Sequence, residues 1–340
     1  MKKNNILYIG NNLVEKTNYA TSMDILSSLL KLEGFTVNKS SSKSNKILRL
    51  LEMCFAVFDY KTKVNYVLID TYSTSSFYYA LLTSQLCRLF RLKYLPILHG
   101  GDLPHRLNLN PKLSSLIFNN SFQNIAPSGY LKYEFELKGY TTLLIPNVIP
   151  ITKYNFKNRQ KLQPKLLYVR SFAKIYNPTM AIEVLKELKN TYSKAVLCMV
   201  GPDKDGTLND VQQLIDKYEL HDSVEITGVL SKEEWHKKSE DFDILINTTN
   251  VDNTPISVIE AMALGLPVVS TNVGGLPYLI SNNIDGVLVD KEQPILMAKK
   301  IVEIIEENKN SFAKMARCKV ENFDWSVVRR QWLKLLNNHE

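Results

Sequence analysis

The stretch from residue 252 to residue 275 constrains the fold more than any other part of the chain. It reads DNTPISVIEAMALGLPVVSTNVGG and lies between two short apolar runs, at 242–247 and 268–271, that predict buried strands. Thr254 is a candidate N-cap for a helix that has Pro255 as its first residue and that Gly265 ends. This order of elements predicts a strand–helix–strand unit of a parallel sheet.

Two carboxylates lie near the start of this predicted helix. Asp252 lies in the loop after the first strand, and Glu260 lies about a turn into the helix. A helix N-terminus attracts phosphate, because its N–H groups are unpaired and its dipole is positive there. Pro has no N–H, so the expected donors are Ile256, Ser257 and Val258. Since carboxylates accept hydrogen bonds from hydroxyls, the unit suits a nucleotide sugar. The alternative is an ordinary unit with a solvated Asp and a surface Glu.

The stretch resembles the signature of the family 4 retaining glycosyltransferases of the GT-B fold. In that signature two acidic residues flank seven others ahead of an Ala-Met-Ala-x-Gly-x-Pro-Val run. Asp252 matches the first acid, which in the family contacts hydroxyls of the donor sugar, and Glu260 matches the second, which holds the ribose. The resemblance implies an α/β fold with two Rossmann-like domains facing each other across a cleft.

The implied domains follow from the predicted linker at 152–164. Residues 1–155 are expected to form an N-terminal acceptor-binding domain, and residues 156–320 a C-terminal nucleotide-sugar-binding domain. Residues 321–340 are expected to form a helix that crosses back to the first domain.

In the first domain, candidate residues follow predicted strands. Gly10 matches a family glycine near the donor diphosphate, and Asn11 beside it is a weak acceptor candidate. His99, in a His-Gly-Gly-Asp run, matches a histidine that reaches the transferred sugar, and Asp102 is a second weak acceptor candidate. Groups at the carboxyl ends of parallel strands face the ligand crevice. A turn glycine, a structural histidine and a turn-capping aspartate are the alternatives.

In the second domain, Arg170 and Lys174 match an Arg and a Lys that neutralise the donor diphosphate in the family. Arg suits bidentate phosphate binding and Lys supplies a point charge, whereas the alternative is two solvated loop cations. The family holds the base with a segment that matches Thr227, Gly228 and Val229. The chain departs from the pattern where Asp252 replaces the usual Glu and Asn253-Thr254-Pro255 replaces a glycine-rich turn, which leaves the donor sugar open.

Charge is unevenly placed along the chain. Residues 1–150 carry 17 Lys and Arg against 9 Asp and Glu, whereas residues 151–340 carry 25 of each. A basic half suits an anionic acceptor or an acidic membrane surface, and plain solubility is the alternative. The apolar run at 47–58 has basic flanks, so it either docks at a membrane interface or packs on the sheet. No apolar run approaches the ~20 residues that span a bilayer, and the scattered cysteines predict reduced thiols.

The expected activity is transfer of a hexose from a UDP- or GDP-sugar to a hydroxyl of a saccharide or lipid-linked acceptor, with retention, in cell-surface polysaccharide synthesis. No metal or further cofactor is expected, because two cations and the helix N-terminus meet the charge of the leaving diphosphate. No nucleic-acid partner is expected. The protein is expected in the cytoplasm, with attachment to the inner face of the membrane left open. An epimerase of the same fold and a non-catalytic nucleotide-sugar-binding protein are the alternatives.

Overall fold

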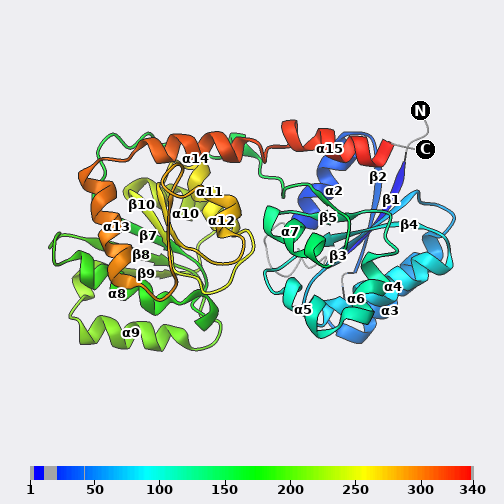
Figure 1. The fold of residues 1–340 in the computed structure, drawn as a ribbon, viewed down its shortest axis with the longest axis horizontal. Coiled ribbons are helices and arrows are strands. Elements are labelled where there is room, and N and C mark those ends of the chain that lie inside the picture. The colour runs from blue at the N-terminus through cyan, green and yellow to red at the C-terminus, as the bar shows by residue number, and fades with distance from the viewer. Residues whose placement is uncertain (1–3, 11–20, 42, 338–340) are drawn as a thin grey trace. The chain divides into compact units, whose positions relative to one another are not determined.

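The chain forms two compact units, each built on one parallel sheet of six strands (Figure 1). The structure is a computed structural model that describes residues 4–10, 21–41 and 43–337. Unit 1 comprises Met1–Ile149 and Phe323–Glu340, and unit 2 comprises Pro150–Asn322. The predicted α/β class is observed in both units.

The sheet of unit 1 has the strand order β2-β1-β3-β4-β5-β6, and every neighbouring pair is parallel. Its central register pairs Ile6 of β1 with Val37 of β2 and with Tyr66 of β3. The strands are β1 (Asn5–Ile9), β2 (Thr36–Ser40), β3 (Tyr66–Thr71), β4 (Lys93–Leu98), β5 (Asn124–Ala126) and β6 (Thr142–Leu144).

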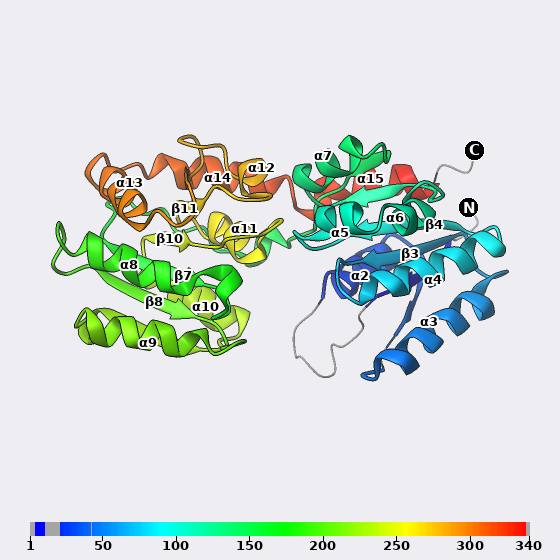
Figure 2. The ribbon, with the colours of Figure 1, turned by 60° about the horizontal axis from the view of Figure 1, so that its bottom comes forward.

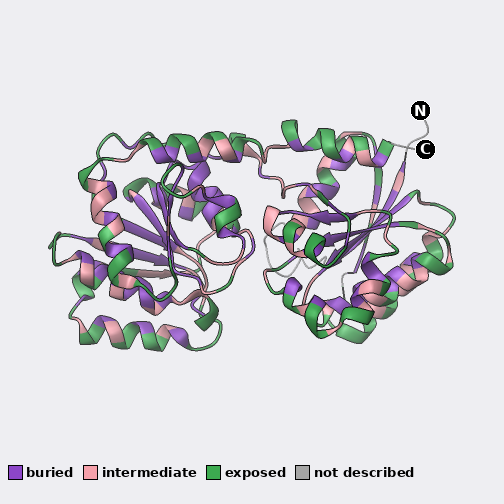
Figure 3. Cartoon of the chain, viewed as in Figure 1, coloured by how far each residue is buried: buried purple, intermediate pink, exposed green. Residues whose placement is uncertain are grey.

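Helices cover both faces of this sheet (Figure 2). They are α2 (Ser22–Leu32), α3 (Lys46–Tyr60), α4 (Ser76–Leu89), α5 (Leu103–Leu109), α6 (Pro111–Phe118), α7 (Gly129–Leu137) and α15 (Trp325–Asn337). Leu7 of β1 points to the core that α3 to α7 cover, whereas Tyr8 points to the core that α2 and α15 cover. Both faces are therefore buried, as expected for a parallel sheet (Figure 3).

Unit 2 repeats the architecture with the strand order β12-β11-β10-β7-β8-β9. Its strands are β7 (Lys165–Val169), β8 (Val196–Val200), β9 (Val224–Gly228), β10 (Ile244–Asn247), β11 (Val268–Thr271) and β12 (Val287–Val289). Its α-helices are α8 (Pro178–Leu188), α9 (Thr207–Lys217), α10 (Lys232–Lys238), α11 (Ile256–Ala263), α12 (Leu276–Leu279), α13 (Pro294–Glu306) and α14 (Ser311–Glu321). Leu166 and Tyr168 of β7 pack in one core with Ile182 of α8 and Ile301 of α13.

The division between the units lies before residue 150, six positions ahead of the predicted start at 156. Tyr154 is part of unit 2 because its hydroxyl donates to Glu260 Oε1 at 2.9 Å and its carbonyl accepts from Arg317 Nη1 at 2.9 Å. At the other end, α15 is part of unit 1: Trp332 is buried beside α2, and Asn4 Nδ2 donates to the carbonyl of Leu336 at 2.9 Å.

No helix within the described ranges is long and apolar enough to cross a membrane.

Candidate functional site

The candidate donor residues lie at the carboxyl edge of the sheet of unit 2. Arg170 directly follows β7, and Asp252 lies in the loop after β10. Because β7 and β10 are paired in the sheet, these two strand ends are neighbours. The guanidinium of Arg170 forms an ion pair with the carboxylate of Asp252, and its Cζ lies 4.2 Å from the ring centroid of Tyr176. Burial lowers the pKa of Arg170, but a guanidinium keeps its proton at neutral pH.

Hydrogen bonds join the arginine loop to the loop that carries Asp252. The backbone N–H of Asn250 donates to the carbonyl of Ile175 at 2.8 Å, and Thr248 Oγ1 donates to the carbonyl of Asn177 at 2.7 Å. Lys174 lies in the same loop with its side chain exposed. The two predicted cations therefore come from one loop, which is hydrogen-bonded to the loop that carries Asp252 (the acid loop).

The Val-Gly-Gly turn after β11 packs directly on the acid loop. The N–H of Gly275 donates to the carbonyl of Asp252 at 3.0 Å. A Cβ atom at Gly274 would overlap the carbonyl oxygen of Asp252, and one at Gly275 would overlap that of Asn253. Gly274 also has φ +52°, which disfavours a side chain. Both glycines are thus required for the position of Asp252.

The helix after the acid loop begins one residue later than predicted. Pro255 is the N-cap of α11 and has an extended backbone, with ψ 119°. The prediction that Thr254 caps the helix is wrong: Pro255 is the N-cap, and Thr254 Oγ1 has no hydrogen-bond partner among the described residues. The N–H of Val258 donates to the carbonyl of Pro255 at 3.1 Å, so the N–H groups of Ile256 and Ser257 are the ones without an acceptor among the described residues.

Buried polar atoms without a partner occur in the two loops that carry Arg170 and Asp252. Within the part of the chain that the structure describes, they include Arg170 Nε, Asn250 Oδ1 and Thr254 Oγ1. Such atoms are rare in folded proteins and each needs an explanation. Next to two unpaired helix N–H groups, they indicate a site for a polar ligand.

Glu260 is a buried acid with several partners. Its side chain is 4% exposed, and Oε1 accepts from Tyr154 OH at 2.9 Å and from Lys232 Nζ at 2.7 Å. His236 Nε2 lies 3.8 Å from Oε2, too far for a hydrogen bond but close enough for an ion pair when protonated. Burial acts to raise the pKa of Glu260, but His236 and Lys232 together lower it below its ordinary value.

The sequence analysis missed the three partners of Glu260. Lys232 and His236 stand four residues apart on α10, a spacing that places both on one face of a helix. That spacing was the available signal for these two. Tyr154 had none, because its contact with Glu260 joins residues 106 positions apart.

The predicted base-binding residues lie at the end of β9, beside the end of β8. Thr227 Oγ1 donates to the carbonyl of Gly228 at 3.1 Å, and the same carbonyl accepts from the N–H of Gly201 at 2.8 Å. Gly228 has φ +70°, and Val229 after it is 58% exposed. Because β7, β8 and β9 are parallel neighbours in the sheet, this segment lies at the same sheet edge as Arg170.

Unit 1 holds a second polar cluster, at the carboxyl edge of its own sheet. His99 follows β4, and its Nε2 lies 2.9 Å from Oδ1 of Asp70 on β3. Tyr8 OH donates to the same oxygen at 3.0 Å, and the ring of Tyr72 stacks on His99 with the centroids 4.8 Å apart. Burial, reinforced by the charge of Asp70, raises the pKa of both tyrosines, so both remain neutral hydroxyls.

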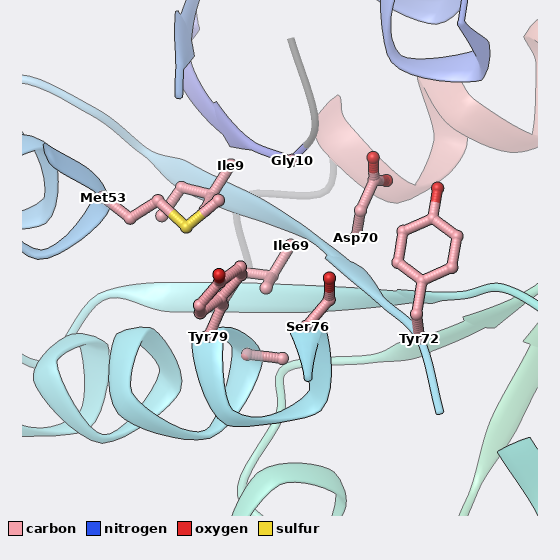
Figure 4. Close-up of a pocket in the computed structure, with 9 residues that line it drawn as sticks. Ile9, Gly10, Met53, Ile69, Asp70, Tyr72, Ser76 and Tyr79 are labelled. Atoms are coloured by element: carbon pink, nitrogen blue, oxygen red, sulfur yellow. The ribbon is translucent and has the colours of Figure 1, made fainter. Parts of the chain in front are cut away.

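Gly10 lies against this cluster, where a Cβ atom would overlap Oδ2 of Asp70. The two residues line a small pocket shown in Figure 4, together with Ile9, Met53, Ile69, Tyr72, Ser76, Tyr79 and Ala80. Sequence reasoning missed Asp70, although a carboxylate at the end of the strand before that of His99 was a usable signal.

Of the two weak acceptor candidates, the structure describes only Asp102. Asp102 is exposed at the start of α5, and its side chain makes no cap hydrogen bond there. Asn11 lies outside the described residues. Within the described ranges, no group of three or more His, Cys, Asp or Glu side chains is placed to hold a metal ion.

Comparison with known protein families and sequences gives one consistent result. A family model described as "Glycosyl transferases group 1" matches residues 151–319. The putative colanic acid biosynthesis glycosyltransferase WcaL of Escherichia coli is 32% identical over 169 residues, which are 46% of this chain and 41% of WcaL. The amylovoran biosynthesis glycosyltransferase AmsK of Erwinia amylovora is 28% identical over 54% of this chain and 47% of AmsK. The chain thus spans less than half the length of these relatives.

Solved structures match over nearly the whole chain. Sucrose-phosphate synthase from Thermosynechococcus elongatus superposes with a TM-score of 0.79 at 17% identity, covering 98% of both chains. HepE from Anabaena, solved in complex with UDP, gives a TM-score of 0.76 at 15% identity, covering 99% of this chain and 100% of HepE. The GT-B fold class predicted from the sequence is confirmed.

Proposed function

The chain belongs, through residues 151–319, to the glycosyl transferases group 1, and we propose that it transfers a sugar from a nucleotide-diphosphate sugar to a hydroxyl of a saccharide acceptor. The observation that carries the proposal is the Arg170–Asp252 pair beside the start of α11, where buried polar atoms lack partners. The names of WcaL and AmsK favour an acceptor in polysaccharide synthesis.

In this proposal the diphosphate binds at the start of α11. The N–H groups of Ile256 and Ser257 donate to phosphate oxygens, with Arg170 and Lys174 supplying positive charge from the adjoining loop. Arg170 then contacts both the phosphate and Asp252, because the several N–H donors of its guanidinium can bind two anions at once. A phosphate there would also give Arg170 Nε the partner that it lacks.

The two ends of the donor are assigned to the two acids. Asp252 accepts hydrogen bonds from hydroxyls of the sugar, and Glu260 accepts them from the ribose. Oε1 of Glu260 already accepts hydrogen bonds from Tyr154 and Lys232, so Oε2 is the oxygen that can accept one from a ribose hydroxyl. The base lies along Thr227, Gly228 and Val229. The HepE structures, which hold UDP and UDP-glucose, favour a uridine nucleotide as the first donor to try.

Transfer breaks the bond between the anomeric carbon and the diphosphate oxygen, and the electron pair stays on the diphosphate. The oxygen of the acceptor hydroxyl forms the new bond to the anomeric carbon, and its proton passes to the departing diphosphate. Arg170, Lys174 and the helix N-terminus stabilise the charge that develops there, so the proposed reaction needs no metal. Retention of the anomeric configuration is part of the proposal because the signature at 252–275 resembles that of retaining enzymes. His99 is proposed to contact the transferred sugar, and Asp102 the acceptor. A lipid-linked saccharide as acceptor would bring the enzyme to the inner face of the membrane.

The test starts from thermal-shift measurements with UDP-, GDP- and ADP-sugars, followed by turnover with the best donor in the presence and absence of EDTA. We expect stabilisation by one donor class and transfer that EDTA leaves unchanged. Arg170→Ala should lower kcat by roughly 10²- to 10³-fold, as expected for loss of a group that stabilises developing charge. Arg170→Lys keeps the charge without the fork, so an intermediate loss is expected.

The outcomes separate the proposal from its alternatives. Isomerisation of the sugar without any acceptor would identify an epimerase, and binding without turnover of any donor would identify a binding protein. Failure of every nucleotide sugar to stabilise the protein would refute the donor site itself.

A further inference from the structure

The helix α3 of unit 1 has two apolar faces instead of one. Its inner face is buried in the core, with Met53 2% and Val57 0% exposed. Large apolar side chains also lie on the outside of the same helix: Ile47 is 70% exposed, Leu48 55%, Leu51 59%, Phe55 70% and Phe58 52%. Packing on the sheet therefore explains the apolar residues on the inner face of α3 but not those on its outside.

The exposed residues form one continuous surface. At 100° of rotation per residue they fall within an arc of about 100°, and the row from 47 to 58 is about 17 Å long. We call these five side chains the outer face of α3. A helix on the surface of a soluble protein ordinarily has polar residues there, and a contiguous apolar patch marks a contact surface.

Basic residues flank the outer face at both ends. Lys43 and Lys46 lie at its N-terminal end, and Lys61 and Lys63 follow the helix. Segment 43–63 carries five Lys and Arg against two Asp and Glu. Lys61 Nζ lies 3.8 Å from the ring centroid of Phe58, so positive charge is held directly against an apolar residue of the face.

We propose that the outer face of α3 docks on an anionic membrane surface. The helix would lie in the plane of the interface, with its apolar arc among the acyl chains and the flanking lysines at the headgroups. An uncharged apolar partner would match the arc but not the cations. The docking is a property of unit 1 alone, and it deepens the proposed function by favouring a lipid-linked acceptor.

The test is co-sedimentation of the full chain with vesicles, without donor or acceptor. We expect binding to vesicles of phosphatidylcholine and phosphatidylglycerol, weaker binding at high salt, and much weaker binding to pure phosphatidylcholine. The double variant Leu51→Ser, Phe55→Ser should bind roughly tenfold more weakly or worse, because it removes two large apolar groups from the face. As a matched control, Ile284→Ser, Ile295→Ser removes two apolar residues of unit 2 that are 55% and 68% exposed, and should bind like the parent.

Three results would overturn the proposal. The first is an absence of binding to anionic vesicles at both salt concentrations, and the second is equal binding of both double variants. The third is light scattering that shows a dimer for the parent and a monomer for Leu51→Ser, Phe55→Ser, since the outer face would then join two copies of the chain. Turnover with a soluble acceptor should be unaffected by either variant, so failure of membrane docking and failure of the proposed function are distinguishable.

Discussion

At the scale of single residues, each acid of the two clusters has a basic or hydrogen-bonding partner within the chain. Arg170 contacts Asp252, Lys232 contacts Glu260, and His99 contacts Asp70. Each pair joins residues that the sequence separates widely. A buried charge is costly unless paired, which explains why each acid has a basic or hydrogen-bonding neighbour. The pairs also fix the orientations of the side chains that a ligand would meet.

We predict that Asp70 positions His99 for catalysis. Asp70→Asn removes the charge that holds Nε2 of His99, and kcat should fall roughly ten- to a hundredfold, the range seen for partners that orient metal-binding histidines. The KM for the donor should change little, because the proposed contacts to the diphosphate, the ribose and the base all lie in unit 2. Tyr8→Phe is the control: it removes the other hydrogen bond to Asp70 and should have a smaller effect. Equal losses in the two variants would contradict a specific role for Asp70.

We predict that Glu260 makes stability depend on pH. Its pKa is lowered in the folded chain, so its contribution is complete above the ordinary value of 4.5 and is lost as pH falls below that value. Glu260→Gln should lower the free energy of unfolding by about 1–3 kcal/mol at pH 7, and this deficit should shrink as pH falls below 4.5. Urea unfolding at several pH values measures both. Glu136→Gln breaks only an exposed pair with Lys132, so it should cost less than about 0.5 kcal/mol.

At the scale of elements, the sequence predicted those site residues that directly follow a strand. Arg170, Asp252 and His99 each follow a strand, and the carboxyl ends of parallel strands meet at one edge. The start of α11 was misplaced by one residue, because Pro255 is as compatible with an N-cap as with a first helical position. The spacing of Lys232 and His236 indicates that they share one face of α10, but no local pattern specifies that this face and residue 154 lie against Glu260, so its partners were missed.

The glycine turn after β11 gives a prediction at this scale. Gly275→Ala should destabilise unit 2 by about 3 kcal/mol and weaken donor binding, because its methyl group would push away the carbonyl of Asn253 and with it Asp252. Gly139→Ala is the matched control. Gly139 has φ +82° and open space around it, so only backbone strain of about 1–2 kcal/mol is expected, with donor binding unchanged. Thermal unfolding and donor titration of both variants check this.

At the scale of the whole molecule, the chain forms unit 1 from two separated segments and unit 2 from one continuous segment. The last helix, α15, supplies Val328, Trp332 and Leu336 to a core that is otherwise built mainly from strands and α2. The family resemblance implied a helix there that crosses back to the first domain. The residues that it contacts could not be read from local pattern, because Asn4 and Glu33 lie about 300 positions away in the chain.

We predict that Trp332→Ala destabilises unit 1 by about 3–5 kcal/mol, since this buried indole is 2% exposed. Unfolding followed by circular dichroism should then show an earlier transition for one unit and an unchanged transition for the other. Val327→Ala on the same helix, where Val327 is 45% exposed, should change stability by less than about 0.5 kcal/mol. A single transition shifted as a whole would show instead that the two units unfold together.

The return of α15 also has a consequence during synthesis on the ribosome. Residues 150–322 emerge as a complete folding unit, whereas the first 149 residues still lack the helix that covers one side of their sheet. Until residues 325–337 have left the exit tunnel, apolar groups such as Ile6 and Tyr8 remain partly uncovered. A nascent chain stalled before that point would be a natural client for chaperones, although its second half is already native.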